Sequence, residues 1–372
     1  MRPSTLIERG LAIRRGMEFI YRVAKRREHF NQYGSDLLSC FHYVSLTSKD
    51  VALRGMALEM GRERARRWRR DNSRLARDAD ADTVIYLIHG TLAATGLGLP
   101  DKALDRQIRK AVADFAARDF LNFDPTCEAP PLDVPEQCEC GYWNERGRKR
   151  CCECRRRLTM MSRYGVWYDA LISTYTAQRF GVALGGARYA DVLKWLPSLR
   201  PYRGREGSSN PDYYDTLYAI THIVYTLNDY SVYRLSPRWL PEEFAFLKAN
   251  LKEAISSEDP EMVGEFLDAL RAFGLKEDHP LIRRGMEYLL SCQNPDGSWG
   301  DVDEEGIYQR YHPTWTAVDG LRDYAWRGRR LSFPELLPTL RAWAKDSHGH
   351  ARRPMLSPDE GTMTGDISKV NI

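Results

Sequence analysis

The amino-acid sequence predicts an all-α protein built from about six helical hairpins. Apolar residues recur at three- and four-residue spacing along almost the whole chain of 372 residues, which is the period of an amphipathic helix. The alternation of apolar and polar residues that marks a half-buried strand is scarce. In addition, the heptapeptide IRRGMEF at residues 13–19 returns as IRRGMEY at residues 282–288. Such repetition indicates duplicated supersecondary units.

Two kinds of helix alternate along the chain, one with a strongly charged side and one richer in Tyr, Thr, Ser and apolar residues. The charged helices are expected in an outer layer, at residues 5–28, 50–77, 102–118, 183–195, 241–256 and 280–292. The others are expected in an inner layer, at residues 35–47, 82–95, 164–180, 212–228, 259–273 and 314–327. Several inner helices open with residues that cap free backbone N–H groups or suit a first turn. These residues are Ser35, Asp82, Asp215, Asp259 with Pro260, and Pro313 with Thr314.

Two segments break this pattern. Residues 124–157 hold most of the cysteines and lack helical periodicity, so they are expected to form an insertion in a helical body that spans residues 1–345. Residues 346–372 also lack apolar periodicity and contain Gly, Ser, Asp and Pro. They are expected to form a mobile C-terminal tail.

One motif carries a family resemblance. Residues 293–300 read QNPDGSWG and follow an expected outer helix. Gly297 permits a tight turn, and Trp299 can stack between neighbouring hairpins. The motif resembles the QW repeat of the terpenoid cyclases and protein prenyltransferases, and this resemblance implies that the hairpins close into a single α/α toroid.

The resemblance leaves the chemistry open. Class II terpenoid cyclases protonate an alkene with the middle aspartate of an Asp-x-Asp-Asp motif, and residues 80–83 (DADT) are similar to a relaxed version, with Asp82 as the general acid. Those enzymes generally use a cleft between two toroids, whereas only one fits here. Protein prenyltransferases hold zinc with Asp, Cys and His. His312 lies near the expected histidine, but residues 301–304 (DVDE) lack the cysteine, and a lysine-rich diphosphate site is not evident.

Three histidines each follow a small polar residue of an expected inner helix by seven positions, which is almost two turns, so both side chains share one face. The pairs are Ser35 with His42, Asp82 with His89, and Asp215 with His222. If the helices pack around a common axis, the three imidazoles converge on a metal ion such as zinc, iron or copper. Three ligands leave an open position for water, dioxygen or substrate. Alternatively, each histidine is a core residue hydrogen-bonded to a nearby Tyr or Asp.

Further polar residues are expected around the same cavity. Asp82 and Asp215 could orient a ligand or act as acid or base, although both could equally be plain helix caps. Tyr86 and Tyr218 share the faces of these aspartates and could position substrate or simply pack. His312 is expected at the mouth, where a small substrate would enter.

The insertion contains a metal-binding pattern. Cys138 and Cys140 precede Cys151 and Cys154, and two such pairs are typical of a zinc ribbon with four thiolates and no open position. Cys152 competes with its neighbour as a ligand. Structural zinc would stabilise a segment too small for a core of its own. The alternative is free or disulfide-paired cysteines.

The insertion is also basic. Between residues 138 and 157, seven Arg or Lys residues outnumber three Glu residues. With Tyr142 and Trp143, this segment could bind single-stranded nucleic acid or an acidic protein. The arginine-rich helix at residues 62–77 would add charge, although a solvated outer face explains it as well.

The bulk composition narrows the function classes. A net charge of +4 does not demand a nucleic-acid or membrane partner, and no apolar run approaches the ~20 residues of a membrane span. The charged start of the chain is unlike a signal peptide. Because most cysteines have metal-ligand spacing, a reducing, cytoplasmic location is expected. Nothing in the sequence indicates an oligomeric state.

The favoured hypothesis is an enzyme with a mononuclear, histidine-bound metal in the central cavity, acting on a small molecule as a lyase, hydrolase or oxidase. One alternative is a class II-type terpenoid cyclase that uses Asp82 as acid. Another is a non-catalytic module that binds nucleic acid or protein through the basic zinc ribbon.

Overall fold

The structure, a computed structural model, describes residues 3–132, 134–142, 144–145, 147–205, 210–303 and 306–350, with side chains for those between residues 6 and 345. The chain is mostly helical, so the predicted all-α class is confirmed. Within the described part, strand is limited to β1 (Val134–Pro135) and β2 (Met160–Met161), which pair antiparallel.

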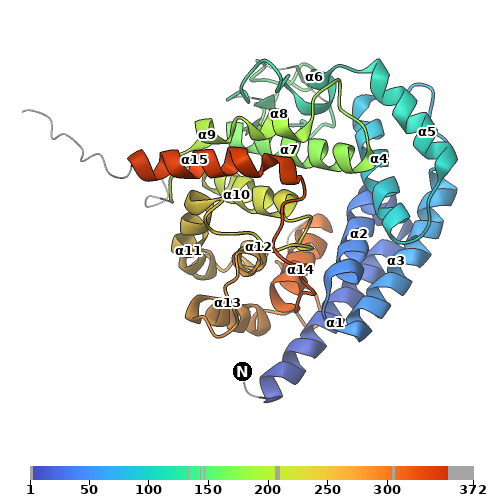
Figure 1. Ribbon diagram of the computed structural model, residues 1–372. Coiled ribbons are helices and arrows are strands. Elements are labelled where there is room, and N and C mark those ends of the chain that lie inside the picture. The colour runs from blue at the N-terminus through green and yellow to red at the C-terminus, as the bar shows by residue number, and fades with distance from the viewer. Residues whose placement is uncertain are drawn as a thin grey trace, which may run out of the picture.

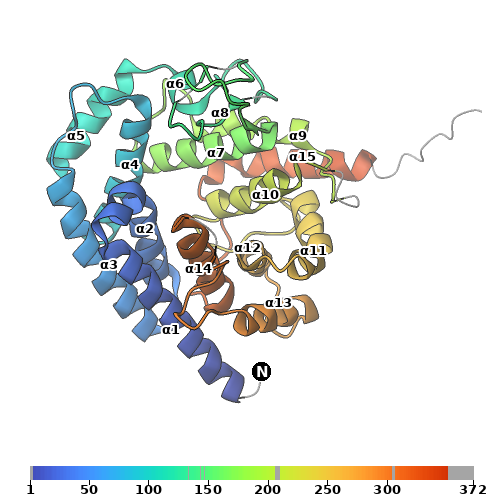
Figure 2. The same ribbon diagram turned by 180° about the vertical axis from the view of Figure 1, so that it is seen from behind.

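The helices form two groups, α1 to α5 on one side of the molecule and α10 to α14 on the other, with α7 and α8 running across the top between them (Figures 1 and 2). The first group is α1 (Pro3–Lys25), α2 (Arg27–Thr47), α3 (Val51–Asp71), α4 (Ala81–Gly96) and α5 (Lys102–Ala111). Next come η1 (Val112–Asp114), α6 (Ala117–Leu121), α7 (Arg163–Phe180), α8 (Tyr189–Leu193) and α9 (Leu196–Leu199). The remainder is α10 (Tyr213–Leu227), α11 (Pro241–Ser256), α12 (Pro260–Ala272), α13 (Pro280–Ser291), α14 (Tyr308–Leu321), η3 (Pro334–Leu336) and α15 (Leu337–His350).

Several helix starts differ from those predicted. Ser35 lies inside α2, just after a kink at Tyr33. The cap of α4 is Asp80, whose carboxylate accepts from the backbone N–H of Thr83, so Asp82 belongs to the first turn. Pro313 lies inside α14, which begins five residues earlier at Tyr308. Cap-type residues occur in clusters here, and the sequence does not decide which member ends the helix.

Of the predicted caps of α10 and α12, only that of α12 is confirmed. Asp259 caps α12 as predicted, because its carboxylate accepts from the backbone N–H of Met262. Asp215 lies in the first turn of α10, which begins at Tyr213. The outer helix expected at residues 183–195 is reduced to the short α8.

Helices from the inner-layer prediction form a chain of neighbours: α2 packs on α4, α4 on α7, α7 on α10, α10 on α12, and α12 on α14. The two ends of this chain also meet. Tyr311 of α14 donates to Asp36 of α2 at 2.8 Å, and Arg322, just after α14, donates to Ser48 at 3.1 Å. The side chains at the centre are therefore surrounded by helices.

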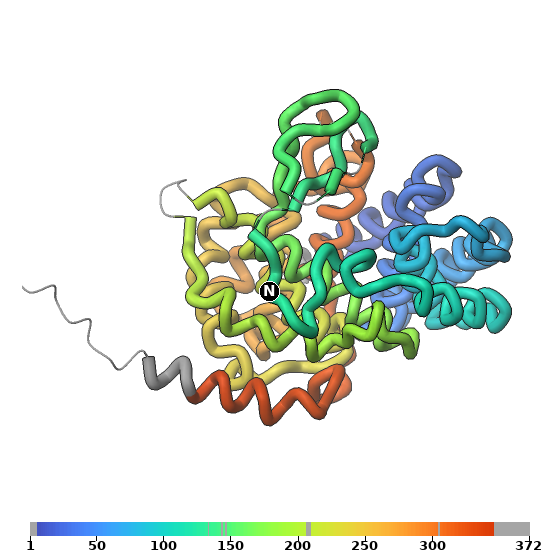
Figure 3. Tube along the Cα trace, turned by 90° about the horizontal axis from the view of Figure 1, so that it is seen from above, coloured from blue at the N-terminus to red at the C-terminus, as the bar shows by residue number. Residues whose placement is uncertain are grey.

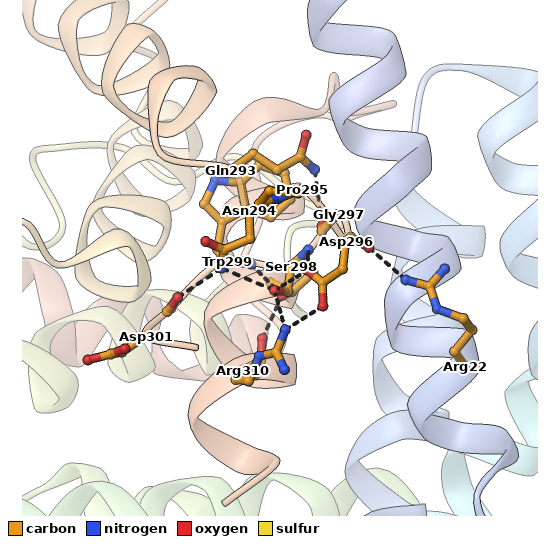
Figure 4. Close-up of polar contacts among 12 residues, drawn as sticks. Arg22, Gln293, Asn294, Pro295, Asp296, Gly297, Ser298, Trp299, Asp301 and Arg310 are labelled. Carbon is orange, nitrogen blue, oxygen red and sulfur yellow. Dashed lines mark hydrogen bonds and ion pairs between the residues drawn. The ribbon is translucent and has the colours of Figure 1, made fainter. Parts of the chain in front are cut away.

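The QNPDGSWG loop joins three elements (Figure 4). The Trp299 indole is fully buried and donates to the Leu289 carbonyl of α13 at 2.8 Å, while its backbone N–H donates to Thr314 of α14. Gly297 has a φ of 91°, and a Cβ there would lie 2.7 Å from the Arg15 carbonyl oxygen of α1. The tight turn therefore lets the loop lie directly on the first helix.

The insertion projects from the helical body on the side opposite α15 (Figure 3). At the base of the insertion, Val134 of β1 pairs with Met161 of β2. The predicted tail begins within α15, which continues to His350, and residues 351–372 lie outside the described part. No described helix is both long and apolar enough to cross a membrane.

Candidate functional site

A cavity of about 710 Å³ is lined by residues of α2, α4, α7, α10, α12 and α14. Its wall is polar and aromatic rather than aliphatic. Its lining includes the acidic residues Asp36, Glu136, Asp169, Glu261, Glu265, Asp268 and Asp319; the histidines His42, His89, His222 and His312; and the aromatic residues Tyr43, Tyr168, Tyr218, Tyr225, Tyr230, Tyr308 and Trp315. The volume is that of a site for a small molecule.

Two carboxylates and one imidazole form the cavity cluster, which we define as Glu261, Glu265 and His312. The glutamates are four residues apart on α12 and therefore share one face, and the histidine reaches them from α14. One ligand atom from each side chain lies within 4.8 Å of the others. Tyr218 donates a hydrogen bond to Glu261 at 2.5 Å, and Thr221 donates one to Glu265. Both glutamates are therefore held in place by α10.

The charges in the cavity cluster are unequal. Burial raises the pKa of Glu265 to about 8. Burial also acts to raise the pKa of Glu261, but His312 at 3.1 Å and Tyr218 outweigh it and lower that pKa. Burial alone would lower the pKa of His312, whereas Glu261, Asp36 and Glu265 together raise it to about 9. The surroundings thus favour the charged forms of Glu261 and His312 and disfavour the charged form of Glu265.

The three predicted metal-binding histidines line this cavity, but the structure does not bring them together at one point. Clusters of three or more potential ligands are found at two places in the described residues, and His42, His89 and His222 are in neither. Their predicted convergence depends on equal distances from the helix starts, and the starts differ, because α2 begins at Arg27. Burial lowers the pKa of each to about 4, so they are neutral.

Of the other predicted site residues, some line the cavity and others lie outside it. Tyr218 lines the cavity and contacts Glu261, as a positioning role requires. Asp82 is exposed and does not line the cavity, and Tyr86 packs on Trp68 and donates to a backbone carbonyl of α2. Asp215 lies behind the wall, close enough to Asp169 to raise its pKa.

The acidic residues of the wall, including both glutamates of the cavity cluster, were not predicted from the sequence. A usable signal was present, because Glu261 and Glu265 stand four residues apart on the expected inner helix at residues 259–273. Two carboxylates on one face of a helix that is expected to be buried are costly unless they are hydrogen-bonded, paired with a cation or bound to a metal.

The second cluster of potential ligands lies in the insertion. The sulfur atoms of Cys138, Cys140, Cys151 and Cys154 lie within 4.8 Å of one another, and none of these residues forms a disulfide. The Cys138–Cys154 and Cys140–Cys151 sulfur distances are 3.5 and 3.6 Å. Zn–S bonds of about 2.3 Å in a tetrahedron place sulfur atoms about 3.8 Å apart. The four cysteines thus have a geometry that could bind a metal such as zinc.

The group of four close sulfur atoms includes Cys151 and not its neighbour Cys152. Exposed basic residues surround it, among them Arg148, Lys149 and Arg155. Trp143, part of the predicted nucleic-acid surface, lies outside the described residues.

Comparison of the chain with protein-family models, with curated proteins and with solved structures gives no match.

Proposed function

We propose that this protein is a metal-dependent enzyme whose active site is the central cavity, with a divalent cation held by Glu261, Glu265 and His312. The observation that carries the proposal is the convergence of these three ligand atoms within 4.8 Å inside a cavity of small-molecule size. Carboxylate and imidazole ligands suit manganese, iron and zinc. Three protein ligands leave coordination positions open for water and substrate.

The energetics of burial favour a cation at this position. Glu265 is 2% exposed and Glu261 9% exposed, and they share a single cationic side chain, that of His312. Two nearby buried carboxylates do not both ionise without further positive charge. A divalent ion would supply it, while Tyr218 and Thr221 would orient the ligating oxygens.

We further propose that the helices form a single α/α toroid similar to those of the terpenoid cyclases and protein prenyltransferases. Two observations support it: neighbouring inner helices pack in sequence order around the cavity, and the QW-type loop joins α13 and α14 to α1. Class II cyclase chemistry through Asp82 gains no support, because that carboxylate lies outside the cavity wall.

The metal content of His312→Ala tests the proposal. Mass spectrometry of the purified full-length wild type should find about two metal ions per chain, one in the cavity and one in the insertion. The variant is expected to lose the cavity ion, because two carboxylates alone bind such an ion weakly. His42→Ala is the matched control, since this histidine lines the same cavity outside the cluster, and it should retain both ions. A wild type that holds only the insertion metal, even after incubation with manganese, iron and zinc salts, would refute the cavity ion.

The insertion cysteines are proposed to bind structural zinc in a reducing, cytoplasmic setting. Cys151→Ser is expected to lose this zinc and to make residues between 134 and 161 sensitive to proteolysis, because the segment lacks a sizeable core. Cys152→Ser is the control, since this residue is the direct neighbour and lies outside the cluster. Zinc content and limited proteolysis of both variants measure the effect. Equal loss of zinc from both would show that the ligand assignment is wrong.

A further inference from the structure

The charges that line the cavity are strongly one-sided. Seven carboxyl groups face it, and no lysine or arginine of the described residues does. His42, His89 and His222 contribute no charge, because burial lowers their pKa to about 4. His312 is the remaining source of positive charge in this lining, and Glu261 contacts it. The cavity is therefore electrostatically suited to a cation.

Most of these carboxyl groups already have a partner. Two contribute to the cavity cluster, and three others are engaged from behind the wall. These three are Asp36, which accepts from Tyr311 at 2.8 Å; Asp268, which accepts from Ser231 at 2.7 Å; and Asp319, which pairs with Arg322 at 2.6 Å. Each of these three carboxyl groups therefore has a hydrogen-bond or ion-pair partner within the protein.

Asp169 and Glu136 are different. In the described part of the chain, no side chain donates a hydrogen bond to either carboxylate and neither forms an ion pair. Both residues line the cavity. Asp169 comes from α7, and Glu136 directly follows β1 in the stem of the insertion. Both side chains are exposed to solvent; desolvation by the surrounding wall, then Asp215 and Glu136, nonetheless raise the pKa of Asp169 to about 7. Two neighbouring carboxylates on a cavity wall without a partner of their own are suited to a positively charged ligand.

Aromatic rings stand beside these carboxylates. Tyr168 precedes Asp169 on α7, stacks on His222 with ring centroids 5.2 Å apart, and lies 6.0 Å from Tyr218. All three rings line the cavity. The faces of aromatic rings attract ammonium groups, most strongly where water is excluded. The wall therefore offers a cation both carboxylate charge and ring faces.

We infer that the substrate of this cavity is an organic cation whose ammonium group binds between Asp169 and Glu136, against the rings of Tyr168 and Tyr218. The inference rests on the proposed function in taking the central cavity as the active site. Because Tyr218 also donates to Glu261 at 2.5 Å, the ammonium group would lie beside the cavity cluster, on the side of α7. A diphosphate substrate, by contrast, would face carboxylates, with no lysine or arginine in the described lining to receive it.

A set of three isosteric probes tests the charge preference directly. Choline, 3,3-dimethylbutan-1-ol and 3,3-dimethylbutanoate have a similar bulky end group and differ in charge. Isothermal titration calorimetry on the full-length protein is expected to show choline binding at least about tenfold more tightly than the alcohol, with the anion weakest. Equal affinities, preference for the anion or no binding of choline would overturn the inference.

Variants locate the binding position. Asp169→Asn keeps the shape of the side chain and removes its charge, so choline affinity should fall about tenfold. Glu136→Gln, on a separate segment, should weaken binding in the same direction and serves if the first variant does not fold. Asp82→Asn is the control, since this exposed carboxylate lies outside the wall, and its affinity should match the wild type. Unchanged affinity in both cavity variants would refute the site.

Different results would refute the proposed cavity metal and the proposed substrate class. Choline binding with only the insertion metal present would refute the cavity ion and leave the substrate class standing. Two metals without a preference for the cation would do the reverse.

Discussion

Replacing Trp299 with alanine is expected to lower the free energy of unfolding by about 3–5 kcal/mol. The indole is fully buried, and it lies against Gly16 of α1, where even a Cβ would come within 2.9 Å of the ring. Its N–H donates to Leu289 at the end of α13. Removal would leave a large cavity where the last hairpin meets the first helix, and the Leu289 carbonyl would keep only the weak bond from the Cys292 thiol. Urea unfolding followed by circular dichroism measures the loss.

A second substitution at Trp299 separates the contribution of its apolar volume from that of its hydrogen bond, and a substitution elsewhere serves as the control. Trp299→Phe keeps most of the apolar volume and loses the bond to Leu289, so a smaller cost, about 1–3 kcal/mol, is expected. Val302→Ala is the control: it lies in the same loop with the side chain 51% exposed, and its stability should change by less than about 0.5 kcal/mol. If Trp299→Ala unfolds at the same urea concentration as Val302→Ala, the loop does not join the two ends of the chain.

The role of this loop could be predicted from the sequence because its determinants are local. A glycine at a turn and a tryptophan two residues later are close in the chain, and Trp299 bonds to the helices on either side. The contact of the loop with α1 is long-range and follows only from the resemblance to the QW repeat. The same holds for the four cysteines, whose spacing alone indicates one metal site and whose sulfur atoms meet as expected. The helical class also follows from local periodicity.

The cavity required information of another kind. Whether His42 meets His222 depends on how far each helix extends and on how the helices are offset along the ring, and neither is encoded at the histidines themselves. The kink at Tyr33 joins two helical segments and moves the start of α2 to Arg27. The pair Glu261 and Glu265 had a local signal, but His312 was expected before its helix and lies within α14. Long-range offsets thus decided which polar residues converge.

The contact between α12 and α14 fixes the geometry of the cavity cluster. At Gly264, a Cβ would lie 2.4 Å from the backbone oxygen of Thr316 and 2.5 Å from its carbonyl carbon. At Gly320, a Cβ would lie 3.0 Å from the Cα of Gly264. The two backbones therefore approach more closely than any side chain would allow, and this approach brings His312 to the glutamates.

Gly264→Ala is accordingly expected to push α12 away from α14, since a backbone cannot yield as a flexible side chain does. The free energy of unfolding should fall by about 1–3 kcal/mol or more, and the cavity ion should be lost while the insertion zinc remains. Gly55→Ala is the control, because a Cβ at this exposed glycine of α3 would meet no atom within 4 Å, and it should be stabilised by about 0.5–1 kcal/mol. Metal content and urea unfolding measure both effects. A Gly264→Ala protein that is destabilised but keeps both metals would show that the cavity ion does not depend on the approach of these helices, and therefore that its ligands come from elsewhere.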